Sequence, residues 1–290
     1  MPWPPGKILA KMAAGFAATV LVFAGGCLTP PAFEGLPDRP VIVLAAPGSP
    51  LPAARQIYAS LGAQFHARFP GDEIRWAFID ENVVRALRGQ GLVCQTPRET
   101  AKTLTAGSHS AVAWQSLQLL PGEGLAAIAA VDFGDLAVTG GAPLLNSDRD
   151  YYTVMDALEP LIRPNQPNVL VCHGNRNRGG SNREFLALAN LLTARHPNLI
   201  VAFRHGAPGA TVALARARVL ARQAGTVHFI PFMLVPDDFL VREVMGDTPD
   251  SWKNQVGAAR VTCAEPLGSN PRILAIYLQH LEQAIQNLEE

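Results

Sequence analysis

Two histidines stand where strand-like runs of this sequence end. His173 closes the apolar run Val169–Cys172 and precedes Gly174, and His205 follows the run Leu199–Phe203. Ligands of open α/β sheets bind in the crevice at the carboxyl ends of the strands. Two imidazoles at adjacent strand ends suit a borderline divalent metal such as Co2+, Fe2+, Ni2+ or Zn2+. The pattern therefore predicts a metal or substrate site. The alternative for each histidine is that it caps or packs its strand end.

Charged residues follow the same strand ends. A third run ends at Val235, and Asp237 and Asp238 come next, where either carboxylate could bind the metal or accept a proton. The alternative for this pair is that it caps the following helix. Arginines near His173 and His205 could hold an anionic ligand, or could belong to a solvated loop; they are Arg176, Arg178, Arg183 and Arg204.

The elements that must position these residues alternate between strand-like and helix-like runs. In the first half, strands are expected at residues 41–46, 73–79 and 111–120, with helices at 52–69, 82–90 and 97–106. In the second half, strands are expected at 169–172, 199–203 and 226–235, with helices at 184–195 and 211–224. Such alternation predicts an α/β fold in which a parallel sheet is flanked by helices.

The second half repeats the plan of the first, so two similar lobes with a cleft between them are expected. Pro47-Gly48 falls opposite His173-Gly174, and Pro121 falls opposite Pro236. The histidines occur in the second copy only, since Pro47 and Asp80 take their places in the first. A purely structural histidine would have no reason to favour one copy, so the asymmetry favours a functional role.

The first 40 residues are expected to lie outside the fold. Lys7 and Lys11 precede the apolar run Met12–Ala24, and Gly25-Gly26 lead to Cys27. This order is typical of a secretory leader, so residues 1–27 are predicted to be a signal peptide and the protein to be exported to the periplasm. Cys27 is a candidate for the lipid of a membrane-anchored lipoprotein. Residues 28–40 are Pro-rich and are expected to form a linker, followed by lobes at 41–160 and 161–290.

Composition excludes some classes of partner and site. Lys and Arg together number 24, as do Asp and Glu, so nothing favours nucleic acid as a partner. No CxxC pair occurs among the four cysteines, which excludes a zinc ribbon or a thioredoxin motif. Free, mostly buried thiols are expected, and a disulfide between Cys94 and Cys263 is the alternative.

Several motifs together resemble one enzyme family, the anaerobic cobaltochelatases that insert Co2+ into sirohydrochlorin during cobalamin biosynthesis. The resemblance runs from about Pro40 to the C-terminus. It is carried by Val41–Ser49, Leu119-Leu120-Pro121-Gly122-Glu123, Cys172-His173-Gly174, Pro231–Val235, Gly246–Lys253 and Leu267–Pro271. It implies a lyase with two α/β lobes, a tetrapyrrole substrate, Co2+ or Fe2+ in the cleft, and assembly into a homo-oligomer.

The family's metal ligands are only partly kept. A His on the first strand of the second lobe corresponds to His173, whereas a Glu position falls at His205 and a second His position falls at Phe239. Gln118 stands where the first lobe of the family often has His.

The resemblance nevertheless implies a rearranged site. His173 and His205 are its expected catalytic residues, with Asp238 as a third metal ligand in place of the missing side chains. Arg176, Arg178 and Arg204 would hold the carboxylates of the macrocycle, and Phe239 would stack on its ring. Glu123, after a strand-end turn of the first lobe, is a weaker candidate for contact with substrate or metal.

Two other functions fit the same features. The departures from the ligand set leave open a periplasmic protein that binds metal or tetrapyrrole without inserting one into the other. A general two-lobe solute-binding protein is the third hypothesis, and the family-specific motifs disfavour it because they go beyond a similarity of fold.

Overall fold

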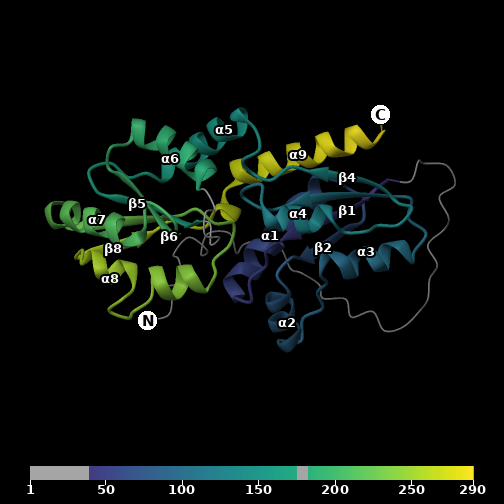
Figure 1. Cartoon of the computed structure of the whole chain (residues 1–290), viewed down its shortest axis with the longest axis horizontal. Coiled ribbons are helices and arrows are strands. Elements are labelled where there is room, and N and C mark those ends of the chain that lie inside the picture. Colours follow the sequence, from purple (N-terminus) through teal and green to yellow (C-terminus); the bar gives the residue numbers. More distant parts are fainter. Residues whose placement is uncertain (1–38, 175–181, 290) are drawn as a thin grey trace, which may run out of the picture. The chain divides into compact units, whose positions relative to one another are not determined.

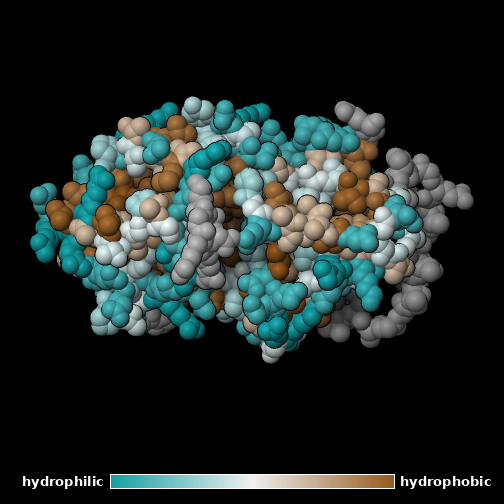
Figure 2. Space-filling model, in the orientation of Figure 1, coloured by the Kyte–Doolittle hydropathy of each residue, from teal (hydrophilic) through white to brown (hydrophobic). Residues whose placement is uncertain are grey.

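The computed structural model describes residues 39–174 and 182–289. The predicted leader, almost all of the predicted linker, and Arg176 and Arg178 lie outside these ranges. Among the described residues, no helix is long and apolar enough to cross a membrane. On the face shown in Figure 2, hydrophobic and hydrophilic residues are interspersed.

Two four-stranded sheets form the fold, and all of their strand pairs are parallel. The first sheet has the order β2-β1-β3-β4 and contains β1 (Val41–Ala46), β2 (Ile74–Phe78), β3 (Ala111–Ser116) and β4 (Ala137–Gly141). The second has the order β6-β5-β7-β8 and contains β5 (Asn168–Gly174), β6 (Leu199–His205), β7 (Thr226–Pro231) and β8 (Arg260–Cys263). The identical order confirms the predicted duplication and the α/β fold class.

Helices surround each sheet (Figure 1). Those that follow the strands of the first sheet are α1 (Pro52–Arg68), α2 (Glu81–Gly89), α3 (Pro97–Thr105), α4 (Glu123–Ala129), α5 (Asp148–Leu158) and the 3-10 turn η2 (Glu159–Leu161). Those that follow the strands of the second are α6 (Arg183–Arg195), α7 (Ala210–Ala224), the π-helical η3 (Phe239–Val244), α8 (Trp252–Val256), η4 (Leu267–Ser269) and α9 (Pro271–Glu289). Local signals fix several starts: Pro52 occupies the first turn of α1, and capping boxes begin α3 and α5.

One hydrophobic core is shared by the two lobes. It joins Ile42 and Leu44 of β1 to Leu170 of β5 and Phe203 of β6, and it includes Tyr277 of α9. Two smaller clusters cover the other faces of the sheets, one in each lobe. Because the central core draws side chains from both halves, the lobes stabilise one another.

The last helix departs from the lobe boundary expected from the sequence, which placed all of residues 161–290 in the second lobe. Helix α9 packs against β3 and β4 and lies along the first sheet in Figure 1. Tyr277 donates a hydrogen bond to Gln118 O at 3.1 Å, and Thr139 of β4 donates to Ala284 O at 2.9 Å. The apolar face of α9 therefore covers the first sheet.

Two predicted strands end earlier than expected. The runs 111–120 and 226–235 leave their sheets at Ser116 and Pro231, and the apolar residues beyond them turn toward the space between the lobes. Strands β4 and β8 were not predicted, because β4 contains two glycines and β8 has four residues with little apolar character.

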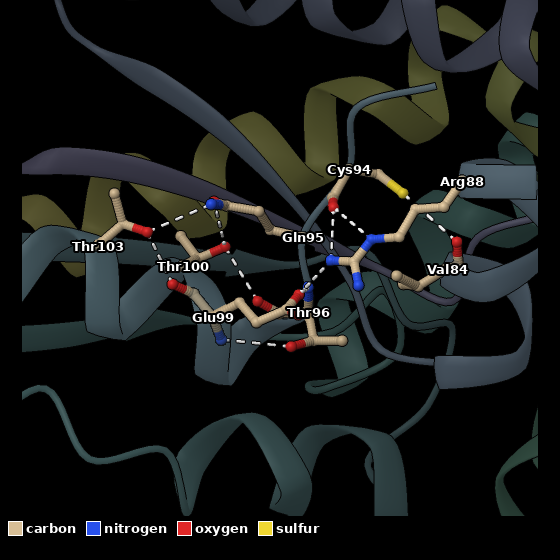
Figure 3. A network of polar contacts seen from close by, with 8 residues as sticks. All are labelled: Val84, Arg88, Cys94, Gln95, Thr96, Glu99, Thr100 and Thr103. Atoms are coloured by element: carbon tan, nitrogen blue, oxygen red, sulfur yellow. Dashed lines mark hydrogen bonds and ion pairs between the residues drawn. The ribbon is translucent and has the colours of Figure 1, made fainter. Parts of the chain in front are cut away.

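A polar network fixes the connection between α2 and α3 (Figure 3). Arg88 donates to Cys94 O and to the carboxylate of Glu99, which lowers the carboxyl pKa of Glu99. The same carboxylate accepts from the backbone N–H of Thr96. Cys94 has a free thiol, as do Cys172 and Cys263. The free thiols confirm that part of the sequence expectation and exclude the alternative disulfide between Cys94 and Cys263. Of these three cysteines only Cys172 is fully buried, so the expectation of mostly buried thiols was wrong.

Candidate functional site

A cavity of about 520 Å³ lies where the carboxyl ends of β1, β3, β5 and β7 meet. It is lined by Pro47, Gly48, Tyr58, residues 117–124, His173, Gly174, Glu184, Phe185, Met233, Leu234, Val235 and Asp237. In the first sheet the chain runs from β1 outward to β2 on one side and from β3 outward to β4 on the other, so a topological switch point lies between β1 and β3. The second sheet has the same arrangement, with its switch point between β5 and β7. Ligands bind at such points in open α/β sheets, and here the two switch points share one cavity.

Glycines in left-handed conformations let the chain turn at the edge of this cavity. Gly48, just after β1, has a φ of 86°, and Gly174, at the end of β5, has a φ of 69°. A Cβ on Gly174 would lie 2.0 Å from the carbonyl oxygen of His205, so no other residue fits there without moving β6. The two glycines occupy equivalent places in the two lobes, as the repeat predicted.

An imidazole–carboxylate pair lies on the second-lobe side of the cavity. Nε2 of His173 is 2.7 Å from Oδ2 of Asp237, and both side chains are about one-third exposed. Burial raises the pKa of the Asp237 carboxyl, but the hydrogen bond and charge of His173, the backbone N–H of Leu240 and the charge of Arg204 outweigh it, and the net shift is downward. Asp237 is therefore an anion that faces His173.

The backbone around Asp237 is fixed from both lobes. Ser49 of the first lobe donates a buried hydrogen bond of 2.9 Å to the carbonyl oxygen of Pro236. Oδ1 of Asp237 accepts from the N–H of Leu240 at 3.0 Å, in the first turn of the helical segment that includes η3. Asp237 therefore caps the helical segment and also pairs with His173, so both roles considered for Asp237 and Asp238 fall to Asp237.

Phe239 and Arg204 form a layer behind His173. Phe239 is 2% exposed, and its ring centroid lies 4.8 Å from that of His173 and 5.2 Å from that of Trp252. The Arg204 guanidinium lies 4.9 Å from the centre of the Phe239 ring and hydrogen-bonds the carboxylate of Glu243. Neither residue lines the cavity. In this structure Phe239 packs against His173 and Arg204 packs against Phe239, so neither forms the stacking surface or the rim expected from the sequence.

His205 and Asp238 do not join the pair. Asp238 has a side chain that is 62% exposed and lies 3.4 Å from Arg242 in an ion pair. Successive side chains on a strand point to opposite faces, so His205 faces away from the side on which Arg204 meets Phe239. Neither residue lines the cavity. Across residues 39–174 and 182–289, no group of three or more His, Cys, Asp or Glu side chains is arranged to hold a metal ion.

The other polar side chains of the cavity come mainly from the first lobe. They are Tyr58 of α1, Gln118, and Glu123 at the start of α4, and Glu184 of α6 joins them from the second lobe. The sequence singled out Glu123 but not Tyr58 or Glu184. Both missed residues lie in helices, where an aromatic or acidic side chain gives no signal that it faces a ligand.

Fold and site together define a class of protein: a duplicated α/β chain with a cavity between its lobes, beside an imidazole–carboxylate pair. The sequence model of the family described as cobalt chelatase (CbiK) matches residues 41–286, so this chain belongs to that family. The resemblance inferred from the motifs is confirmed.

Two curated relatives carry the same activity in their names. The sirohydrochlorin cobaltochelatase of Salmonella typhimurium is 29% identical over 232 residues, which cover 76% of this chain and 86% of the relative. The sirohydrochlorin cobaltochelatase CbiKC of Nitratidesulfovibrio vulgaris is 26% identical over 264 residues, covering 86% of this chain and 92% of the relative.

Solved structures share the fold at lower identity. SirB from Bacillus subtilis, solved with Fe3+, is 15% identical with a TM-score of 0.56, covering 87% of this chain and 97% of its own. CbiX, the terminal enzyme for siroheme biosynthesis in denitrifying bacteria, is 17% identical with a TM-score of 0.53. The match covers 85% of this chain and 99% of CbiX. These likenesses support the two-lobe fold.

Proposed function

We propose that this protein inserts a divalent metal, Co2+ in the first place, into sirohydrochlorin or a closely similar tetrapyrrole. The observation that carries the proposal is the His173–Asp237 pair in a cavity between two duplicated lobes, in a chain of the cobalt chelatase family. The names of both curated relatives support the same substrate. Family membership favours insertion over the binding-only alternative.

The reaction exchanges two protons for one metal ion. Two pyrrole N–H bonds break, the nitrogen atoms bind the metal, and two protons leave the macrocycle. A site for this reaction has to replace water around the ion and accept protons. Imidazole nitrogen suits Co2+ and Fe2+ as a ligand, and a carboxylate beside it can accept a proton or hold the ring in place.

His173 and Asp237 supply these two groups next to each other. When Nε2–H of a neutral His173 donates to Asp237, the lone pair resides on Nδ1, so the carboxylate fixes the tautomer of the imidazole. We assign His173 as the metal-binding residue and Asp237, rather than Asp238, as its carboxylate partner. Asp237 is suited to the role because its backbone and its second oxygen are already held.

The macrocycle carries carboxylates that need cationic or hydrogen-bonding partners. Arg176 and Arg178 lie two and four residues after Gly174 in the sequence and remain our candidates for that rim. Arg204 is already paired with Glu243 behind His173. Any effect of replacing Arg204 on insertion is therefore expected to arise through the packing of Phe239 behind His173 or through the lost charge near Asp237.

Residues 28–290, purified without oxygen, should accelerate insertion of Co2+ into sirohydrochlorin, followed by absorbance against a protein-free control. Substituting Ala for His173 should remove at least 100-fold of that acceleration, the scale of a lost general base or ligand. His66, exposed on α1, gives the matched control His66→Ala, which should keep full activity.

Binding of the macrocycle at a fixed ratio without acceleration would instead show a binding protein on a chelatase scaffold. Parallel runs with Co2+ and Fe2+ identify the preferred ion, which should give the higher kcat/KM.

We also propose that the chain is exported, since Lys7, Lys11 and the apolar run Met12–Ala24 have the order of a secretory leader. Fractionation of cells that express residues 1–290 or residues 28–290 tests this: only the longer chain should reach the periplasm. Lipidation of Cys27 and assembly into a homo-oligomer are further proposals, checked by mass spectrometry and light scattering.

A further inference from the structure

Tyr58 brings a buried hydroxyl to the first-lobe wall of the cavity. The residue is 6% exposed, on the inner face of α1. Its ring makes edge contacts with Trp76 and Phe78, at centroid distances of 5.3 and 5.6 Å. The hydroxyl oxygen accepts a hydrogen bond of 3.2 Å from the backbone N–H of Gly48, a residue that also lines the cavity. Two aromatic contacts and one hydrogen bond thus hold Tyr58 in place, with its hydroxyl at the cavity.

The proton of this hydroxyl has no acceptor within the described part of the chain. The bond from Gly48 uses an oxygen lone pair and leaves the O–H itself unpaired. Burial, with a smaller contribution from the charge of Asp237, raises the pKa of Tyr58 above its usual value despite the Gly48 bond. The phenol therefore keeps its proton at neutral pH. A buried donor that lacks an acceptor costs free energy unless a ligand satisfies it.

We propose that Tyr58 is a substrate-binding residue that donates a hydrogen bond to a peripheral carboxylate of the tetrapyrrole, and this inference rests on the proposed function. The choice of acceptor follows from the chemistry of the ligand. Pyrrole N–H groups are donors, and the unprotonated ring nitrogens lie inside the macrocycle and are taken by the metal. The carboxylates are the remaining strong acceptors. Tyr58 thus selects for a macrocycle with free acid side chains.

The test measures binding of metal-free sirohydrochlorin by absorbance titration, with residues 28–290 as the wild type. Tyr58→Phe keeps the ring and its contacts and removes only the hydroxyl. A hydrogen bond to a charged acceptor is worth about 10- to 100-fold in affinity, so the Kd should rise by that factor. The insertion rate at saturating substrate should change less than about twofold, because binding and not chemistry is affected.

Two controls make the result specific. Tyr152 on α5 is 53% exposed, so Tyr152→Phe should leave the Kd unchanged. The fully esterified macrocycle has weaker, uncharged acceptors, so the difference between wild type and Tyr58→Phe should shrink with it. Urea unfolding of Tyr58→Phe checks that the cavity wall is intact.

Equal Kd values for wild type and Tyr58→Phe, in a variant with the wild-type urea midpoint, would overturn the assignment. An equal rise in the Kd of Tyr58→Phe for the free-acid macrocycle and for its ester would overturn it as well. Failure of the proposed function is a separate outcome: the wild type would bind the macrocycle but not accelerate insertion, and the titration would still test Tyr58.

Discussion

At the scale of single residues, the site depends on which of two adjacent carboxylates faces the histidine. Asp237 hydrogen-bonds His173 and lines the cavity, while Asp238 is exposed and pairs with Arg242. The difference arises because Asp237 begins a helical segment and directs its side chain back over the first turn, to the N–H of Leu240. Asp238 is already within that turn and faces solvent.

This arrangement predicts opposite outcomes for two similar substitutions. Asp237→Asn removes the charge that pairs with His173 and the proton acceptor, so the insertion rate should fall by about 10²- to 10⁴-fold. Asp238→Asn should stay within about twofold of wild type. Steady-state insertion of Co2+ into sirohydrochlorin measures both. A larger loss in Asp238→Asn than in Asp237→Asn would contradict the assignment of the carboxylate.

The sequence identified His173 correctly as a residue of the cavity but could not rank its neighbours. The turn from β7 into η3 decides between Asp237 and Asp238, and a one-residue difference in a cap has no sequence signature. Tyr58 was missed for a related reason: an aromatic residue on an amphipathic helix usually packs in a core. Phe239 stands where the family places a His, and only the structure shows its ring packed behind His173.

At the scale of elements, the central strands of both sheets were predictable, since β1 is buried throughout and β5 to its fifth residue. The edge strands β4 and β8 were not, because their pairing depends on neighbours that propensity does not record. The ends of β3 and β7 were overestimated, because the chain remains mostly apolar over residues 117–120 and 232–235, beyond the sheet. Those residues are buried or half-buried, because they line the cavity or pack in the shared core.

The contact between β7 and β8 contains a histidine that makes folding stability depend on pH. His228 is 2% exposed, and its Nδ1 lies 2.8 Å from Oγ1 of Thr262, its partner across the ladder. Burial, together with the charge of Arg163, lowers the pKa of His228 to about 4. In the unfolded chain the pKa is about 6.5, so the unfolded state binds more protons between those values.

The contribution of His228 to the free energy of unfolding is therefore fully present above about pH 6.5 and is lost as the pH falls toward 4. The loss in the free energy of unfolding should reach about 3 kcal/mol. Urea unfolding at pH 7 and pH 4 measures it, and His228→Gln should show a smaller difference between the two pH values. His66→Gln, on an exposed surface, should behave as wild type. A pH dependence that is unchanged in His228→Gln would assign the effect to other groups.

At the scale of the whole molecule, the shared core makes the two lobes one folding unit. Leu281 of α9 is fully buried in the cluster that also contains Leu44 of β1 and Leu170 of β5. Removing its side chain should cost about 2–5 kcal/mol, the usual range for a large-to-small change in a core.

Leu281→Ala should lower the urea midpoint of a single transition, seen at the same urea concentration by circular dichroism and tryptophan fluorescence. Gln279→Ala, exposed on the same helix, should change the free energy of unfolding by less than about 0.5 kcal/mol. Two separate transitions in either variant would mean that the lobes fold independently.

The packing of α9 on the first sheet also bears on how the chain matures during synthesis. Domains generally fold as units while the chain emerges from the ribosome, the N-terminal part first. Here the first sheet is made early, but the helix that covers β3 and β4 is translated only after all four strands of the second sheet. Until residues 271–289 emerge, that face of the early sheet remains uncovered and presents apolar surface. A chain that emerges N-terminus first, from a ribosome or from an export channel, therefore carries an unfinished first lobe, which chaperones can bind, until the second sheet and α9 have emerged as well.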